Sequence, residues 1–293
     1  MKYVIKNEYY SATVNQVGAE LTSVVTADGR EVMWQSTQEN FWSKHAPLLF
    51  PVCGRLKDAR YTWGGVEYKM NAHGFIGGVT FELVEKSEDC VILRSVANAE
   101  TRAIYPFEYS LTAKYALEGK RVLCSVTIEN NGNEIMPYMF GWHPGFALPT
   151  DGGAKIEDYV LDFGKAEPFK VIPLQNGPFA SHTRNEFPLT DGKYTLCEAQ
   201  IYANDTLILE NPPTRVTLSS KKSPFKLDLE WSEGTPYLCV WKEPNSDARF
   251  ICLEPWTGTP ADGEKAENFE TRAMERLGIG MSVTHTLAFE FSI

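Results

Sequence analysis

The sequence predicts an all-β fold, a large antiparallel β-sandwich. In many short segments apolar residues occupy every second position, turn residues separate these segments, and helical periodicity is scarce. Such alternation is typical of strands with one buried face, because successive side chains point to opposite sides of a sheet. Neither a linker nor a composition shift divides the 293 residues. We therefore expect a single domain over residues 1–293, with sheets packed face to face.

The clearest strands lie between residues 107 and 130. In FEYSLTAKYAL the apolar residues from Phe107 to Leu117 alternate with mostly polar ones, and the alternation resumes in VLCSVTIENNG after EGKR. The two segments predict a β-hairpin that turns around Gly119. Segments such as RVTLSS, FKLDLEW and THTLAFEFSI alternate in the same way. Only ENFETRAMERLG, residues 267–278, has the pattern of a helix, with Gly278 as its end.

Charge and composition exclude several partners. The formal net charge is −10 and no cluster of Lys and Arg stands out, so we expect neither nucleic acid nor membrane as a partner. The amino terminus, MKYVIKNEYYSATVNQ, lacks the continuous apolar stretch of a signal peptide or spanning helix, which favours a cytoplasmic protein. The six cysteines are scattered without CxxC pairs, so reduced thiols are expected.

Several familiar motifs are missing from the sequence. It has no P-loop, no GxGxxG after a strand, no GxSxG and no HExxH. The sequence therefore gives no motif that would indicate a nucleotide-dependent enzyme or a serine hydrolase. Neither a cofactor nor a metal site is expected. A small neutral or weakly charged molecule is the natural partner, and the sequence leaves open whether the protein is a monomer or a homodimer.

Four ionisable residues stand next to Gly, Pro or Trp at the ends of apolar runs. They are Arg55 in FPVCGRLKD, His73 in NAHGFIGG, His143 in FGWHPGF and Glu254 in ICLEPWTG. Where a strand passes into a turn, such a side chain can point into a concave face. A carbohydrate suits this pattern, since its hydroxyls hydrogen-bond to these groups while its C–H faces pack on aromatic rings such as Trp142 and Trp256.

Each of these residues also has a purely structural interpretation. A lone histidine in a sheet protein is more often structural than functional, and Arg55 could pair with Asp58. Glu254 is harder to explain in this way, because an ionised carboxylate in the buried strand RFICLE needs a partner or a raised pKa. The four residues together are therefore stronger evidence for a functional site than any one of them alone.

Three segments together resemble the aldose 1-epimerase (galactose mutarotase) family. They are HAPLLFPVCGRLKDARYTWGGVEYKMNAHGFIGG, GWHPGF and ICLEPWTG. The resemblance covers nearly the whole chain in order and spacing, and looks closest to the branch often associated with lactose operons. It implies the galactose mutarotase-like β-supersandwich. It also implies an isomerase that interconverts the α and β anomers of a hexose without cofactor or metal.

The resemblance implies roles for five residues. Glu254 would be the general base that takes the proton of the anomeric hydroxyl, and His143 the general acid that protonates the ring oxygen. His73 and Arg55 would bind and orient sugar oxygens, and Asp205 in NDTLILEN is a further candidate for sugar binding. Ring opening itself needs one proton acceptor and one proton donor. We expect these two groups to face one another from opposite sides of the hemiacetal, across a cavity as wide as one hexose.

The identity of the sugar stays open at this level. Gly54 precedes Arg55 where better-known mutarotases carry Asn, and the context of His143 also differs from theirs. Some relatives act on hexose 6-phosphates, for which Arg55 and Lys57 would be the nearby cations. The alternatives are a non-catalytic carbohydrate-binding or sensing protein, and a glycoside hydrolase or lyase with Asp205 as second carboxylate.

The remaining histidines and tryptophans are predicted to be structural. His285 is expected in the core or at its rim, His182 in solvent, and His45 near the pocket edge or in a structural role. The other tryptophans, Trp34, Trp42, Trp63, Trp231 and Trp241, are predicted to lie in the core or on sheet faces.

Overall fold

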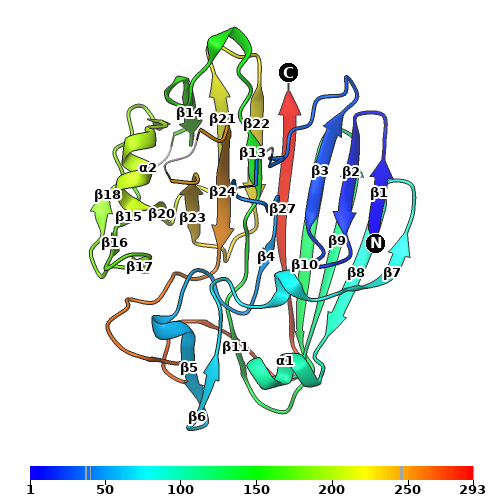
Figure 1. Ribbon diagram of the computed structural model, residues 1–293, viewed down its shortest axis with the longest axis vertical. Coiled ribbons are helices and arrows are strands. Elements are labelled where there is room, and N and C mark those ends of the chain that lie inside the picture. The colour runs from blue at the N-terminus through cyan, green and yellow to red at the C-terminus, as the bar shows by residue number, and fades with distance from the viewer. Residues whose placement is uncertain (37, 40, 166, 245–246, 293) are drawn as a thin grey trace.

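Two large antiparallel sheets dominate the computed structural model, which describes residues 1–36, 38–39, 41–165, 167–244 and 247–292 (Figure 1). The nine-stranded sheet has the order β19 (Lys193–Thr195), β14 (Tyr159–Asp162), β21 (Arg215–Ser220), β22 (Lys226–Trp231), β27 (Ser282–Ser292), β10 (Arg121–Asn130), β9 (Tyr109–Glu118), β8 (Cys90–Val96), β7 (Glu82–Lys86). The eight-stranded sheet has the order β18 (Asn185–Glu186), β15 (Lys170–Ile172), β20 (Thr206–Glu210), β23 (Tyr237–Trp241), β24 (Phe250–Trp256), β12 (Gly141–Trp142), β4 (Leu48–Leu49), and β13 (Gly145–Ala147) also pairs with β24.

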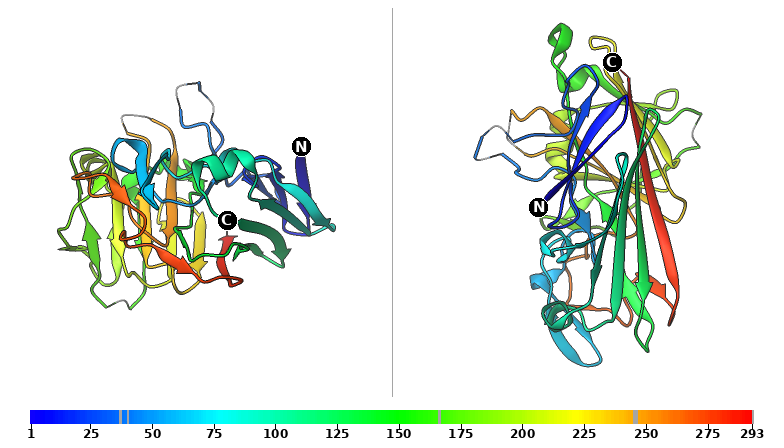
Figure 2. Two further views of the ribbon diagram at one scale, coloured as in Figure 1. Left: turned by 90° about the horizontal axis from the view of Figure 1, so that it is seen from below. Right: turned by 90° about the vertical axis from the view of Figure 1, so that its right-hand side faces the viewer.

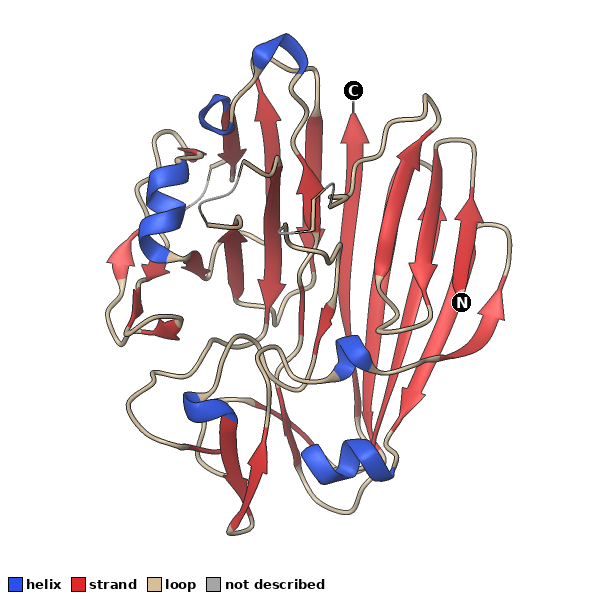
Figure 3. Cartoon of the chain, in the orientation of Figure 1, coloured by secondary structure: helices blue, strands red, loops and turns tan. Residues whose placement is uncertain are grey.

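Smaller sheets and two short helices complete the described part of the chain (Figure 3). The sheets are β1 (Lys2–Lys6), β2 (Tyr10–Asn15) and β3 (Leu21–Thr26); β25 (Glu267–Asn268), β5 (Arg60–Trp63) and β6 (Val66–Lys69); β11 (Met136–Tyr138) with β26 (Glu275–Leu277); and β16 (Leu174–Gln175) with β17 (Phe179–Ala180). The helices are α1 (Ala99–Ile104) and α2 (Glu198–Asn204), with 3-10 turns at Lys57–Ala59, Ile76–Gly78, Asp151–Gly153 and Ile156–Asp158. Neither α-helix of the described segments is long and apolar enough to cross a membrane.

The predicted fold class is confirmed, and so is the central hairpin. Strands β9 and β10 pair in register from Arg121 opposite Glu118 to Asn130 opposite Tyr109. Gly119 lies in the turn with φ of 55°, a left-handed conformation that glycine adopts without a steric cost. The sheet of β1–β3 packs against this hairpin (Figure 2), and the Tyr115 hydroxyl donates to the carbonyl of Ala19 at 2.6 Å. All six cysteines are free thiols, as expected.

The main core lies between the two large sheets and holds residues from Ile5 to Phe291. A continuous core of this kind is what a single domain requires, and the single domain itself stays a prediction. Strand β24 is buried on both faces. Its residues Ile251 and Leu253 belong to the main core, whereas Cys252 and Trp256 belong to smaller clusters on the opposite face. This opposite face carries the candidate site described below.

The predicted helix at residues 267–278 is wrong. The segment contains β25 and β26 with a turn between them, and β25 pairs in parallel with β5. Within the segment Arg272 and Glu267 form an ion pair of 2.5 Å, and both are about nine-tenths buried. Phe269 stacks on Tyr61 at 3.7 Å between ring centroids, and Arg272 donates to the carbonyl of Thr259 at 2.7 Å. Contacts with other segments thus stabilise strands here in place of a helix.

Candidate active site

A cavity of about 890 Å³ lies on the face of the eight-stranded sheet that is turned away from the main core. It is large enough for a monosaccharide. Six of the seven residues that the sequence singles out line it, namely Arg55, His73, His143, Asp205, Glu254 and Trp256. These residues come from positions spread over 200 residues of sequence and meet only in the folded chain.

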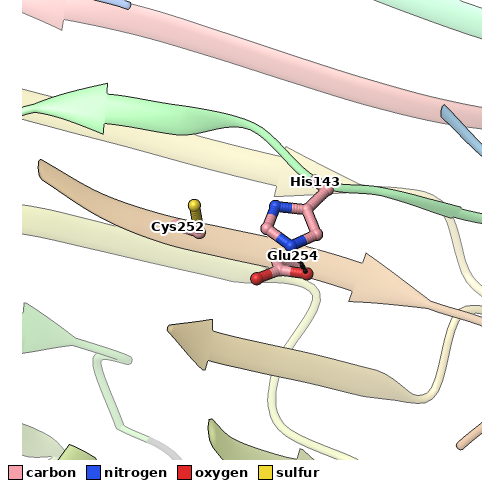
Figure 4. A group of neighbouring side chains, drawn as sticks. All are labelled: His143, Cys252 and Glu254. Atoms are coloured by element: carbon pink, nitrogen blue, oxygen red, sulfur yellow. Dashed lines mark ion pairs between the residues drawn. The ribbon is translucent and has the colours of Figure 1, made fainter. Parts of the chain in front are cut away.

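His143 and Glu254 both belong to the cavity lining and are in direct contact (Figure 4). Nε2 of His143 lies 3.3 Å from Oε2 of Glu254, and the two side chains are 10% and 1% exposed. His143 follows β12, whereas Glu254 lies within β24. The expectation that the two groups face one another across a hexose-wide gap is therefore wrong. The anomeric hydroxyl and the ring oxygen are bonded to the same carbon, so neighbouring groups suffice to reach both.

Burial raises the pKa of Glu254 and lowers the pKa of His143. Loss of solvent raises the pKa of Glu254 well above its ordinary value, and the Trp256 side chain opposes this shift by a smaller amount. Loss of solvent, and next the nearby His73, hold the pKa of His143 well below its ordinary value. Over the intervening pH range the pair carries one proton, so that one member can donate while the other accepts.

His73 is held as a neutral ring with one nitrogen occupied. The backbone N–H of Gly54 donates to Nδ1 of His73 at 3.2 Å, and the backbone N–H of His73 donates to the Gly54 carbonyl at 2.8 Å. Burial and then the charge of Arg55 lower its pKa to about 4. Nδ1 is therefore an acceptor, which leaves Nε2–H as a donor. Its backbone φ of 63° is unusual for a non-glycine residue and is typical of functional positions.

Gly54, which precedes Arg55, has no room for a side chain. A Cβ at this position would overlap the ring of Pro260, and the backbone φ is 74°. No side chain at this position can therefore contact a ligand.

Arg55 and Asp205 form the more open part of the lining. Arg55 makes no ion pair with any residue that the structure describes, so its pairing with Asp58 is not seen. Burial raises the pKa of Asp205, and the charge of Arg55 opposes this shift. Asp205 also has a positive φ, of 58°. Both side chains therefore remain available to polar groups of a ligand.

Trp142 and Trp256 differ in where they point. Trp256 lines the cavity, and its ring lies 5.6 Å from that of His73. Trp142 is not among the described residues that line the cavity; it packs in the main core against Phe140, at 4.6 Å between centroids. Trp142 directly precedes His143, and consecutive residues of a strand point to opposite faces. Trp142 is therefore a core residue rather than a sugar platform.

The structure adds lining residues that the sequence did not single out as functional. Trp42 and Trp241 line the cavity beside His143, and Lys44 and Lys69 lie at its exposed edge. Lys57, which the sequence offered with Arg55 as a nearby cation for a sugar phosphate, is not part of the described lining. No local motif marks the four residues, because they come from separate segments and only tertiary contacts bring them to the site.

The other three histidines have structural partners. His45 lies 3.6 Å from Glu20, and His182 is exposed, 3.5 Å from Asp262. His285 is buried, stacks on Phe140 and lies 3.3 Å from the Tyr138 hydroxyl, so its predicted place in the core is correct.

Two groups of described residues have potential metal ligands within 4.8 Å of one another. One is buried and holds His143, Cys252 and Glu254; the other is at the surface and holds His182, Asp262 and Glu264. Burial and the nearby Glu254 raise the pKa of the Cys252 thiol well above its ordinary value. Since metals bind the thiolate form, this environment disfavours Cys252 as a ligand. The expectation of a metal-free site stays a prediction.

The chain is similar to known proteins in both sequence and structure. The family model described as aldose 1-epimerase matches residues 1–271. The plasmid-encoded protein LacX of Lactococcus lactis is 32% identical over 281 residues, which cover 93% of each chain. The galactose mutarotase related enzyme of Lactobacillus acidophilus has a TM-score of 0.92 with 29% identity, over 100% of this chain and 98% of the other. A galactose mutarotase-like protein of Lactobacillus casei has the same TM-score with 28% identity, over both whole chains.

Fold and site thus define a sugar-modifying protein of the mutarotase-like β-sandwich class. The chain belongs to the aldose 1-epimerase family, with LacX among its relatives. Family membership supports an isomerase-type enzyme that acts on a sugar.

Proposed function

We propose that the protein is an aldose 1-epimerase that interconverts the α and β anomers of a hexose, with Glu254 as general base and His143 as general acid. The observation that carries this proposal is the contact of 3.3 Å between the two groups, which both line the cavity. Both are nearly inaccessible to bulk water, which strengthens their interaction with a bound sugar.

The reaction follows from a pair that shares one proton. Transfer of this proton from Glu254 to Nε2 of His143, across their contact of 3.3 Å, gives the reacting form, in which Glu254 is a carboxylate and His143 an imidazolium. Glu254 takes the proton of the anomeric hydroxyl while His143 gives a proton to the ring oxygen, and the bond between the anomeric carbon and the ring oxygen breaks. The resulting aldehyde rotates about its bond to the next carbon, and the ring closes on the other face as the protons return. No atom is gained or lost. Each group contributes roughly 10²- to 10⁴-fold in rate.

The binding roles are assigned to the groups around this pair. His73 offers Nε2–H to a sugar oxygen because Nδ1 is occupied by Gly54. Arg55 and Asp205 supply a donor and an acceptor at the open side, and Trp256 supplies an apolar face for C–H groups of the ring.

The test is polarimetry of freshly dissolved α-galactose and α-glucose, with and without the protein. We expect a faster approach to the equilibrium rotation for at least one common aldose or aldose phosphate. Absence of any acceleration across such a panel would overturn the proposal. Calorimetric binding of a sugar without turnover, retained in Glu254→Gln, would instead establish a binding or sensing protein. Release of reducing ends from an oligosaccharide would establish a hydrolase.

A phosphorylated sugar is a second candidate substrate. Among the described residues of the cavity lining, Lys44, Arg55 and Lys69 are basic and Asp205 and Glu254 are acidic, and burial favours the neutral form of Glu254. A positive edge in a chain of net charge −10 suits an anionic group. The double variant Lys44→Gln/Lys69→Gln should raise KM for hexose 6-phosphates and leave KM for the free sugars unchanged. Equal effects on both would exclude this preference.

A further inference from the structure

Trp42 packs against His143 in a tilted aromatic contact. The ring centroids are 4.9 Å apart and the planes are inclined by 31°. Trp241 meets the same imidazole in an edge-to-face contact at 5.5 Å and 73°. Trp42 also stacks on Phe250 and touches Trp241 edge-to-face, which places it in a wall of aromatic rings beside the cavity.

The position of Trp42 is defined by specific contacts. Its backbone N–H donates to the Glu243 carboxylate at 3.1 Å, and its carbonyl accepts from the indole N–H of Trp34 at 2.8 Å. A Cβ on Gly145 would lie 2.7 Å from the Trp42 ring, so only glycine leaves space for it. Gly141 has the same relation to Trp256, at 2.5 Å. The two glycines that flank His143 in GWHPG therefore make room for two indoles of the cavity wall.

His143 lacks the contact that usually orients a functional histidine. Such a ring is commonly fixed by a hydrogen bond at the nitrogen that does not react. Nδ1 of His143 is buried and has no hydrogen-bond partner in another residue that the structure describes. The described contacts that hold the ring plane are aromatic, and Trp42 makes the closest of them.

We propose that Trp42 is a positioning residue, whose indole fixes the plane of the His143 imidazole so that Nε2 stays directed at Glu254. This inference rests on the proposed acid–base roles of the pair. Aromatic packing constrains the ring plane in place of the missing hydrogen bond. A small rotation of the imidazole would move Nε2 away from the carboxylate and from the ring oxygen of the sugar, and proton transfer is sensitive to such displacements.

The kinetic test compares Trp42→Leu with Trp42→Phe. We expect Trp42→Leu to lower kcat about tenfold or more with KM changed less than about threefold, because the substrate still binds but the proton donor is misaligned. Trp42→Phe keeps an aromatic face and should recover most of kcat. Trp63→Leu is the matched control, since Trp63 is also half-buried against an aromatic ring but is not in the described cavity lining. It should leave kcat unchanged.

A rise in KM at unchanged kcat would make Trp42 a sugar platform and overturn the proposal, as would equal kcat losses in the Leu and Phe variants. Should Trp42→Leu fail to fold, Trp42→Met removes the ring with less loss of volume and serves the same comparison.

Proton NMR tests the aromatic contact without any reference to activity. Because the indole lies 4.9 Å from the imidazole between ring centroids, we expect its ring current to shift the carbon-bound ring protons of His143 upfield, and His143→Asn assigns them among the five histidines. The shift should vanish in the Leu or Met variant and persist in part in Trp42→Phe. If the parent protein has no epimerase activity, the proposed function fails, but this measurement still shows whether the Trp42 indole packs against the His143 imidazole. An unshifted resonance in the parent, or a shift unchanged in Trp42→Leu, would overturn the inference.

Discussion

Replacing Glu254 by Gln tests the proposed chemistry most directly. Gln keeps the size of the side chain and its capacity to accept a hydrogen bond, but it cannot take a proton at neutral pH. Loss of a general base lowers the rate by roughly 10²- to 10⁴-fold, which corresponds to about 3–5 kcal/mol in the activation free energy. Because Glu254 is only 1% exposed, no water molecule has ready access to replace it.

The substitution should leave binding and folding nearly unchanged. Burial already favours the neutral form of Glu254, and a neutral amide therefore resembles the state that the folded protein prefers. We expect KM within about threefold of the parent and a free energy of unfolding within about 1 kcal/mol. Polarimetry gives the rates and urea denaturation gives the stability.

Glu275→Gln is the matched control. Burial also raises the pKa of Glu275, but Glu275 is not among the described residues that line the cavity. This variant should retain the full rate. A rate for Glu254→Gln above about a tenth of the parent value, with the control unchanged, would refute the assignment of Glu254 as the base.

Three further predictions follow from the same geometry. The pH profile of kcat should be bell-shaped, since the pair of Glu254 and His143 needs one proton in total. The acid limb, where the pair takes up a second proton at His143, should lie well below pH 6.5. The alkaline limb, where the pair loses its proton from Glu254, should lie well above pH 4.5. An acid limb near 6.5 would contradict the burial of the pair. Gly145→Ala should destabilise the fold by about 1–3 kcal/mol and lower kcat, because the new methyl displaces the Trp42 ring; unchanged urea denaturation would argue against this contact. Arg272→Met should cost about 3 kcal/mol by leaving Glu267 buried without its partner, and the double variant with Glu267→Gln should recover part of this loss.

Sequence reasoning succeeded where a pattern has one structural meaning. The hairpin of residues 107–130 was predictable because strict alternation and a turn glycine occur together. The segment 267–278 was not predictable, because its strand β25 pairs with β5 and its Phe269 stacks on Tyr61, and both partners are distant in sequence. Trp142 could have been assigned correctly from its neighbour, since adjacent strand residues cannot both face one cavity. No local signal identified Trp42, whose role depends on its contact with a residue 101 positions away.

The sequence by itself determined the strand-rich class of the fold and the identity of the polar groups in rigid contexts, because alternation and turn chemistry are local properties of the chain. Only the tertiary structure decided that Glu254 and His143 touch, that Trp142 points away from the cavity and that Trp42 packs against the imidazole. Strand register and sheet packing fix these relations, and both are set by contacts between distant segments.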